Sequence, residues 1–175
     1  SSSPLVAGDL VIVTVGAPKA TLAAYEIKSG KQRWTSGNAD PAGYSSPALL
    51  NLAGRMQVVA FTGNSAIGAD PQSGALLWRY PYETTYECNI ATPLEWKGQL
   101  FLSSGENHGS VLLSLKPTGD RFELGTVWSS LGTESVMRNE WQTSMLLDGY
   151  LYGMDNIGSA GPVTHLSCIS AATGE

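Results

Sequence analysis

Residues 66–78 read Ala-Ile-Gly-Ala-Asp-Pro-Gln-Ser-Gly-Ala-Leu-Leu-Trp, and residues 22–34 read Leu-Ala-Ala-Tyr-Glu-Ile-Lys-Ser-Gly-Lys-Gln-Arg-Trp. Both stretches place a short apolar run before a turn that ends in glycine, and a tryptophan follows four residues after that glycine. A glycine at a fixed turn position indicates a backbone conformation that only glycine adopts at little cost. These stretches therefore predict a β-hairpin that recurs along the chain.

The same unit occurs twice more, with variations. The apolar run at 111–115 leads into a turn that ends at Gly119, but Trp128 comes nine residues later and residues 121–125 look inserted. A fourth apolar run leads into a turn that ends at Gly174, just before the sequence stops. The repeated turn glycines and tryptophans are Gly30, Gly74, Gly119, Gly174, Trp34, Trp78 and Trp128.

Each repeat opens with a further β-hairpin upstream of this unit. A Ser/Thr-Pro step, or an altered form of it, introduces apolar residues at Pro4, Pro47, Pro93 and Met145, at intervals of 43, 46 and 52 residues. A short turn then separates two β-rich runs, as at Asp148-Gly149, where both residues tolerate positive φ. Four antiparallel strands per repeat are typical of a propeller blade, which hides its faces by stacking on neighbouring blades.

The sequence thus predicts an all-β fold, a segment of a β-propeller with about four blades. The blades are expected at residues 1–39, 40–85, 86–134 and 135–175 of one domain. The first three have four strands each, and the fourth lacks its outer strand because the sequence ends where that strand is due. A tryptophan on an outer strand can cover apolar surface between two blades while its indole N–H binds a partner, so we expect these rings to be structural.

Composition and charge exclude several classes of function. The chain has 175 residues and a formal charge of −5, and its ten lysines and arginines are scattered singly, so no basic patch for nucleic acid is present. No apolar run approaches the roughly 18 residues that a membrane-spanning helix needs. Cys88 and Cys168 have no metal-ligand spacing, and we expect both to be buried free thiols. The glycine turns lack the strand-to-helix context of a nucleophile elbow or a phosphate loop.

The repeated unit resembles the docking motif Ala-x-Asp-x-x-x-Gly-x-x-x-Trp of propeller repeats of the pyrroloquinoline quinone (PQQ) type. Residues 24–34 match it with Glu26 in place of Asp, residues 68–78 depart from it only at the first position, and residues 168–175 resemble its first part. The whole chain is similar to bacterial PQQ-binding-like β-propeller repeat proteins, which are usually exported. The resemblance implies a periplasmic or otherwise exported protein and a ring of six to eight blades. The remaining blades would come from the same longer chain or from a second copy.

Two sets of loops are expected to share one rim of the propeller: those that enter the inner strands and those that join the second and third strands. Tyr44 lies in one of these loops, and His108 is expected to stabilise its turn rather than act as a base oriented by Glu106. Some rim residues carry the oxygen ligands that calcium prefers, but no EF-hand spacing is present and no metal site is predicted. The candidate ligand-binding residues on this rim are Asn64, Tyr86, Glu87, Asn89, Glu106, His108, Arg138, Glu140, Trp141, Asp155 and Asn156.

The resemblance implies two classes of function. The first is a non-catalytic scaffold, like the outer-membrane assembly lipoprotein, which would engage a protein, peptide or glycan through the rim loops. We favour this class because docking motifs are present, whereas the adjacent cysteine pair of the quinone enzymes is not. The alternative is a fragment of a PQQ- and calcium-dependent alcohol or sugar dehydrogenase, in which Trp141 could stack on a flat ligand. PQQ and calcium are possible cofactors by resemblance only. A third possibility is a structural domain attached to a larger secreted enzyme.

Overall fold

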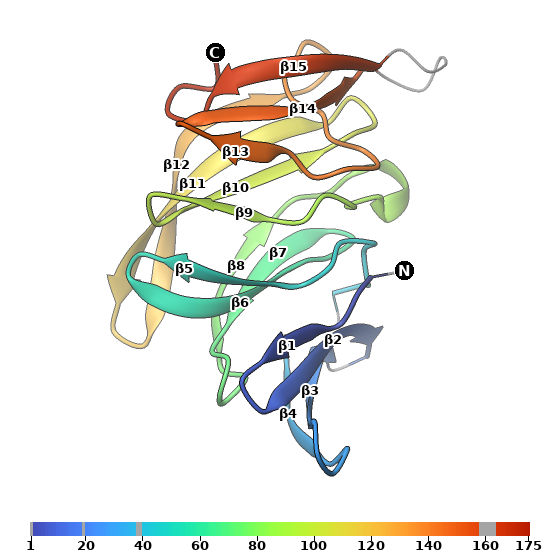
Figure 1. Ribbon diagram of the computed structural model, residues 1–175, viewed down its shortest axis with the longest axis vertical. Coiled ribbons are helices and arrows are strands. Elements are labelled where there is room, and N and C mark those ends of the chain that lie inside the picture. Colours follow the sequence, from blue (N-terminus) through green and yellow to red (C-terminus); the bar gives the residue numbers. More distant parts are fainter. Residues whose placement is uncertain (1, 19, 38–39, 158–163) are drawn as a thin grey trace.

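Four antiparallel sheets are stacked along the longest axis of the molecule in the order of the chain (Figure 1). They are seen in a computed structural model, which describes all residues except 1, 19, 38–39 and 158–163. Three sheets have four strands and the last has three, so the prediction of a partial β-propeller is confirmed. The described residues form no α-helix, and none of their helical turns has the length and apolar character to cross a membrane.

Each sheet is a meander in which consecutive strands are hydrogen-bonded neighbours. The first sheet consists of β1 (Leu5–Ala7), β2 (Leu10–Ala17), β3 (Ala20–Glu26) and β4 (Gln32–Ser36). The second consists of β5 (Ala48–Leu52), β6 (Arg55–Phe61), β7 (Ser65–Ala69) and β8 (Leu76–Pro81). The short 3-10 helix η1 (Thr85–Glu87) leads to the third, which consists of β9 (Leu94–Trp96), β10 (Gln99–Ser104), β11 (Gly109–Thr118) and β12 (Arg121–Leu131). The fourth consists of β13 (Met145–Leu147), β14 (Tyr150–Asn156) and β15 (Thr164–Ser170).

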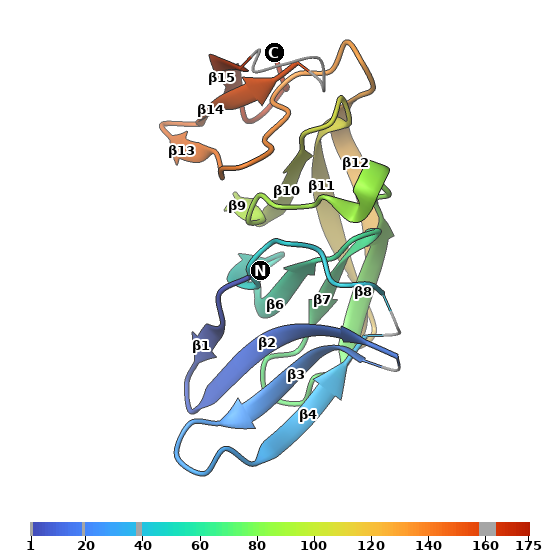
Figure 2. The same ribbon diagram turned by 90° about the vertical axis from the view of Figure 1, so that its right-hand side faces the viewer.

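The hydrophobic cores lie between the sheets, because the side chains of each strand alternate between its two faces. In β6, Val58 and Ala60 pack toward the first sheet, whereas Val59 and Phe61 pack toward the third. A third core joins the third and fourth sheets and includes Leu112, Leu151 and Ile169. Turned by 90°, the molecule shows the sheets as successive layers (Figure 2). Stability therefore depends on contacts between neighbouring blades, since no sheet has a core of its own.

The tryptophans of the three complete blades occupy one shared register position. In each sheet the tryptophan of the outer strand lies opposite a residue of the third strand, and a β-bulge separates this pair from the next one. The pairs are Trp34 with Ala24, Trp78 with Gly68, and Trp128 with Leu112. A bulge increases the local twist of a strand, so it re-aims the ring that stands beside it.

Two of these rings reach the next blade. The indole Nε1 of Trp34 donates a hydrogen bond of 3.2 Å to the carbonyl of Pro71, and that of Trp128 donates one of 2.9 Å to the carbonyl of Ala171. Both acceptors lie in the glycine turn of the following sheet, and a Cβ added at Gly74 would lie 2.6 Å from the Trp34 ring. The turn glycines Gly30, Gly74, Gly119 and Gly174 all have φ between 60° and 75°.

Trp78 packs into the core between the second and third sheets but does not donate its indole hydrogen bond to the glycine turn of the third sheet. Its indole covers Gly68 and donates a hydrogen bond of 2.6 Å to Oε1 of Gln57 in its own sheet. The hairpin of β11 and β12 is much longer than its counterparts, and we call its end, residues 114–125, the arm. The arm extends alongside the second sheet (Figures 1 and 2) and packs Leu115 and Phe122 into the same core as Trp78.

The outward face of the fourth sheet is apolar and exposed. Its large side chains Met145, Leu147, Tyr150, Tyr152 and Leu166 have exposed fractions of 38% to 75%. Cys168 lies opposite Tyr152 and is exposed too, because no described residue packs another sheet against this face. Both cysteines are free, and Cys88 is half-buried, so the expectation that both thiols are buried is wrong.

Candidate functional site

Residues 40–47, 82–93 and 132–144, which precede inner strands, lie on the same side of the molecule as residues 62–64 and 105–108, which join second and third strands. This side is at the right in Figure 1. Contacts between loops fix their relative positions. The backbone N–H of Tyr44 donates a hydrogen bond of 2.9 Å to the carbonyl of Asn89. Gly105 lies so close to Glu140 that an added Cβ would come within 2.5 Å of the glutamate Cβ. We call this side of the molecule the loop rim.

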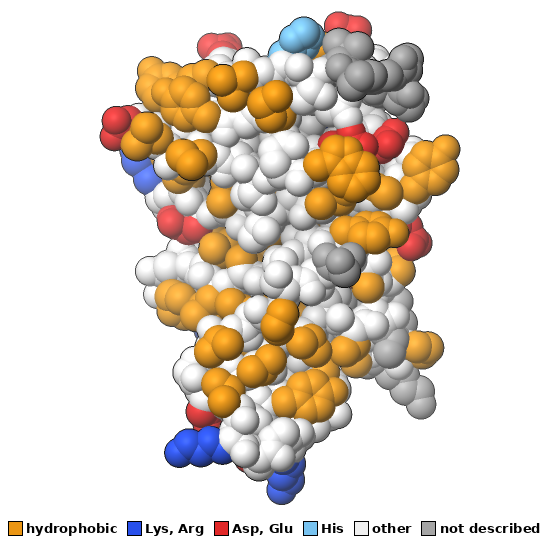
Figure 3. All heavy atoms as spheres, turned by 45° about the vertical axis from the view of Figure 1, so that its right-hand side comes forward, with side chains coloured by type: hydrophobic (Ala, Val, Ile, Leu, Met, Phe, Trp, Pro, Cys, Tyr) orange, Lys and Arg blue, Asp and Glu red, His pale blue; other side chains and the backbone are white. Residues whose placement is uncertain are grey.

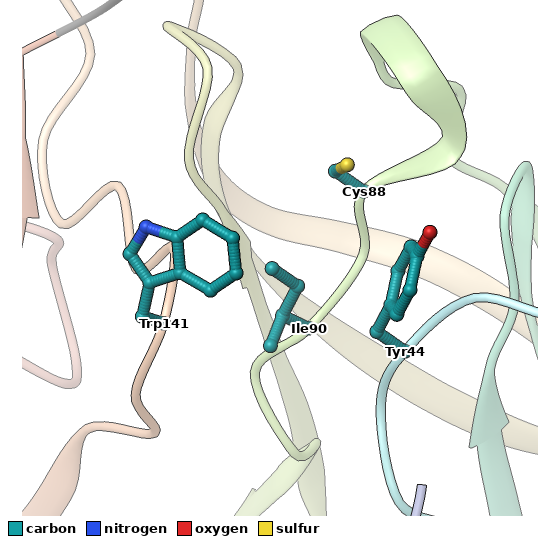
Figure 4. Close-up of a pocket in the computed structure, with 4 residues that line it drawn as sticks. All are labelled: Tyr44, Cys88, Ile90 and Trp141. Carbon is teal, nitrogen blue, oxygen red and sulfur yellow. The ribbon is translucent and has the colours of Figure 1, made fainter. Parts of the chain in front are cut away.

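A cavity of about 360 Å³ opens on the loop rim where the second, third and fourth blades meet. Its walls are Tyr44 from the loop before β5, Cys88 and Ile90 from the loop before β9, and Trp141 from the loop before β13. Figure 4 shows the rings of Tyr44 and Trp141 on either side of Ile90. Trp141 is 77% exposed and Tyr44 is 49% exposed. The cavity therefore presents two aromatic rings to an incoming ligand.

Two carboxyl groups, which we call the carboxyl pair, lie beside this cavity. Glu106 belongs to the loop between β10 and β11, and Glu140, which is 9% exposed, precedes Trp141. Burial raises the pKa of Glu140, and the charge of Glu106 together with a hydrogen bond between the two side chains raises it further. Burial also raises the pKa of the Cys88 thiol, and the charges of the same two glutamates add to this effect. In the part of the chain that the structure describes, neither glutamate forms a salt bridge.

Asn89 is a structural residue of the loop rim. It is buried, and its Nδ2 donates to the carbonyl of Thr62 at 2.7 Å and to that of Tyr82 at 3.3 Å. Its Oδ1 accepts a hydrogen bond of 3.2 Å from Oγ1 of Thr84. The side chain thus joins the loop before β9 to the loop after β6, and its polar atoms are engaged within the protein.

Arg138 and Asp155 form a buried ion pair. The Nε of Arg138 donates to Oδ1 of Asp155 and its Nη2 to Oδ2, both at 2.8 Å, and the Arg138 backbone N–H adds a bond of 2.7 Å to Oδ1. Although burial alone would raise the pKa of Asp155, the bonds from Arg138 lower it overall. These bonds fix the loop before β13 to the end of β14.

Other predicted residues lie apart from the cavity or are engaged elsewhere. The ring of His108 packs against that of Tyr82 with centroids 4.4 Å apart, and burial lowers the pKa of this histidine. Oδ1 of Asn64 is 3.5 Å from Nη2 of Arg79. Oδ1 of Asn156 is buried and has no hydrogen-bond partner among the described residues.

Tyr86 and Glu87 project from η1 into solvent. Tyr86 is 78% exposed, and both residues have a left-handed backbone, with φ of 65° and 56°. Non-glycine residues in this conformation store strain of about 1–3 kcal/mol each, which the surrounding contacts must offset. Such strain is common in segments that present side chains to a ligand. Glu87 also adds an exposed carboxylate to the loop rim.

The oxygen ligands expected on this rim do not fit one calcium site. Calcium needs six to eight oxygens converging at about 2.3–2.6 Å. Both carboxylate oxygens of Asp155 face Arg138, and Asn89 is engaged with backbone carbonyls and Thr84. No group of three His, Cys, Asp or Glu side chains within the described residues is arranged to hold a metal ion.

Trp141 and Glu140, both predicted rim residues, are brought together with Glu106 around the cavity. Tyr44 was placed on the rim from its loop but not among the candidate binding residues, and Ile90 was not singled out at all. Ile90 precedes the Thr92-Pro93 step, and β9 begins at Leu94. The sequence offers one sign that Ile90 is accessible on the loop rim: it is an apolar residue in a long loop, before the strand that the Thr-Pro step introduces.

Comparisons with known proteins agree with this architecture. The crystal structure of BamB from Moraxella catarrhalis superposes with a TM-score of 0.56 at 20% sequence identity, over 94% of this chain and 44% of that one. The chain therefore spans less than half the length of that protein, and the likeness concerns the fold. No curated protein matches the chain. A family model described as outer membrane protein assembly factor BamB matches residues 1–175, which confirms the resemblance to PQQ-type repeats, and the chain belongs to this family of β-propeller proteins.

Proposed function

We propose that this chain is part of a non-catalytic scaffold in an exported bacterial protein, and that it binds a protein, peptide or glycan through the loop rim. The observation that carries this proposal is the cavity between Tyr44 and Trp141, whose aromatic walls are exposed at the junction of three blades. Exposed aromatic rings on a rigid support are typical of binding surfaces. The description of the family, an outer membrane protein assembly factor, supports an exported scaffold.

The alternative, a fragment of a PQQ- and calcium-dependent dehydrogenase, has less support. The side-chain oxygens of Asn89 and Asp155 are engaged within the protein rather than directed at a common point. PQQ is a polycarboxylate, and the carboxyl pair beside the cavity repels an anion. Saturating PQQ with calcium is therefore expected to leave the melting temperature of the full-length protein unchanged, whereas a clear rise would favour the dehydrogenase.

Photo-crosslinking at the cavity tests the binding role directly. A photoreactive benzoylphenylalanine replaces Tyr44 in the full-length protein, which is produced in its own host and irradiated in intact cells. We expect a covalent adduct with a specific protein, identified by mass spectrometry after cell fractionation. The same group at Glu123, which is exposed on the arm, is the matched control and should give no such adduct. If Tyr44 forms no adduct, and no glycan on an array binds in a manner that requires Trp141, the proposed function is wrong.

A further inference from the structure

We propose that the cavity binds an extended protein segment that places an apolar side chain between Tyr44 and Trp141 and a neighbouring Lys or Arg side chain on the carboxyl pair. This inference rests on the proposed function and narrows its ligand to one chemical class. The two halves of the site, apolar and acidic, adjoin at Cys88, which lines the cavity and feels the charges of Glu106 and Glu140. The loop that carries Glu106 is held there by a hydrogen bond of 3.1 Å from Oγ of Ser104 to the carbonyl of Cys88.

The apolar half has the size and walls for a side chain. Its volume of about 360 Å³ is at the lower end of ligand pockets, which hold roughly 300–1,000 Å³, so it suits one or two side chains better than a large cofactor. Tyr44, Ile90, Cys88 and Trp141 offer contact area and few polar atoms. Tyrosine and tryptophan lose little conformational entropy on binding, which is why such rings often dominate the affinity of an interface.

The acidic half lacks a counter-charge in the described protein. Glu140 is 9% exposed, and its burial and the like charge of Glu106 beside it raise its pKa. The nearby cations are already engaged, since Arg138 is paired with Asp155 and Arg79 is paired with Asp40 at 2.7 Å.

A cation from a partner would restore the balance of charge at this place. The space-filling view shows acidic and hydrophobic side chains together on the rim side at the right, with no Lys or Arg of the described residues visible among them (Figure 3). A positively charged partner group would be attracted to this part of the rim before contact and held by it afterwards.

A protein segment suits these groups better than a glycan does. A sugar presents several hydroxyl groups, which need a set of hydrogen-bond donors as well as acceptors around an aromatic ring. The buried amide of Asn89 and the carboxylate of Asp155 are engaged in hydrogen bonds within the protein. The free groups that remain beside Trp141 are carboxylates, which select a cation.

The test is a selection of binding sequences followed by affinity measurements. The full-length protein is screened against a phage library of random octapeptides and, in parallel, against a glycan array. We expect the enriched peptides to contain Lys or Arg next to Phe, Leu, Trp or Tyr. Their affinity should fall as the salt concentration rises, because the acidic half of the site is partly exposed.

Variants of the two halves make the assignment specific. Trp141→Ala should weaken binding about 30-fold, in the range of an interface hot spot, and Glu140→Gln about five-fold with a smaller salt dependence. Glu123→Gln, a matched change on the exposed arm, should leave binding unchanged. Glu140→Gln is not expected to lower the melting temperature, because burial and the charge of Glu106 disfavour the ionised form of the carboxyl group that the substitution removes.

The outcomes separate this inference from the proposed function. Enrichment of acidic or purely apolar peptides, or equal binding by wild type and Glu140→Gln, overturns the inference while binding at the rim stands. Glycan binding that requires Trp141, without peptide enrichment, also overturns the inference and keeps the proposed function. If neither library yields a ligand that depends on Trp141, both are wrong.

Discussion

At the scale of single residues, the missing side chain of Gly68 decides where Trp78 lies. A Cβ there would be 2.1 Å from the indole Nε1, so Gly68→Ala must displace the ring and break its bond to Gln57. We expect unfolding free energy to fall by about 2 kcal/mol, the usual cost of overpacking a core. Urea denaturation followed by tryptophan fluorescence measures this loss. Gly125→Ala is the control, since its Cβ would meet only the movable hydroxyl of Ser114, and an equal loss there would contradict this explanation.

The turn carboxylate of Asp70 makes stability depend on pH. Burial raises its pKa, but bonds from Arg55, Ser73 and Gln72 outweigh this and lower the pKa to about 2. A carboxyl group whose pKa is lower in the folded state stabilises the protein above its unfolded pKa, and this contribution is lost as the pH falls toward 2. Asp70→Asn should therefore lose on the order of 1 kcal/mol at pH 7, a value reduced for partial exposure. In urea denaturation at pH 7, 4 and 3, the difference from wild type should shrink with the pH; a constant difference would exclude this cause.

At the scale of elements, the arm joins the second and third blades where Trp78 makes no hydrogen bond to the glycine turn of the next blade. Phe122 is 9% exposed and lies in the core between the second and third sheets. Phe122→Ala should lower the unfolding free energy by about 3 kcal/mol, as for other buried phenylalanines. Val127→Ala on the same strand is the control, because that side chain is 43% exposed and should cost little. Calorimetry of the two variants compares them, and similar melting temperatures would show that the arm does not support this interface.

The strands and turns were predictable because glycine and tryptophan mark them at fixed spacings. The docking of the arm was not, since an insertion at 121–125 shows a longer hairpin but not the sheet that it covers. Among the predicted rim residues, the sequence could not separate Glu140 and Trp141, which lie at the cavity, from Asn89 and Asp155, whose polar atoms are engaged within the protein. The same polar residue types serve a ligand or the protein itself, and only the partners in space distinguish the two uses. Arg138 and Asp155 are 17 residues apart, so their ion pair depends on how the fourth blade places the loop before β13 against the end of β14.

At the scale of the whole molecule, the outward face of the fourth sheet is an apolar surface that further blades of a ring could cover. Residues 1–175 produced alone should self-associate through this face, because large exposed apolar patches favour association. Leu166→Lys, at a residue that is 75% exposed, should shift residues 1–175 toward the monomer in sedimentation velocity at several concentrations. Thr126→Lys, exposed on the outer strand β12, is the charge-matched control. Unchanged association of the Leu166 variant would place the contact elsewhere.

The arm also bears on the order in which the propeller opens. Because it packs Leu115 and Phe122 of the third blade into the core with Trp78 of the second, these two blades cannot separate without exposing that whole core. Native-state hydrogen exchange should therefore find the second and third blades in one cooperative foldon, whose central amides exchange last. The amides of β1 and β15, at the two ends of the stack, should exchange first. In most repeat proteins the repeats can open one at a time. Here the second and third blades would instead open together, so the loop rim would keep its shape on these two blades while the first and last strands fluctuate.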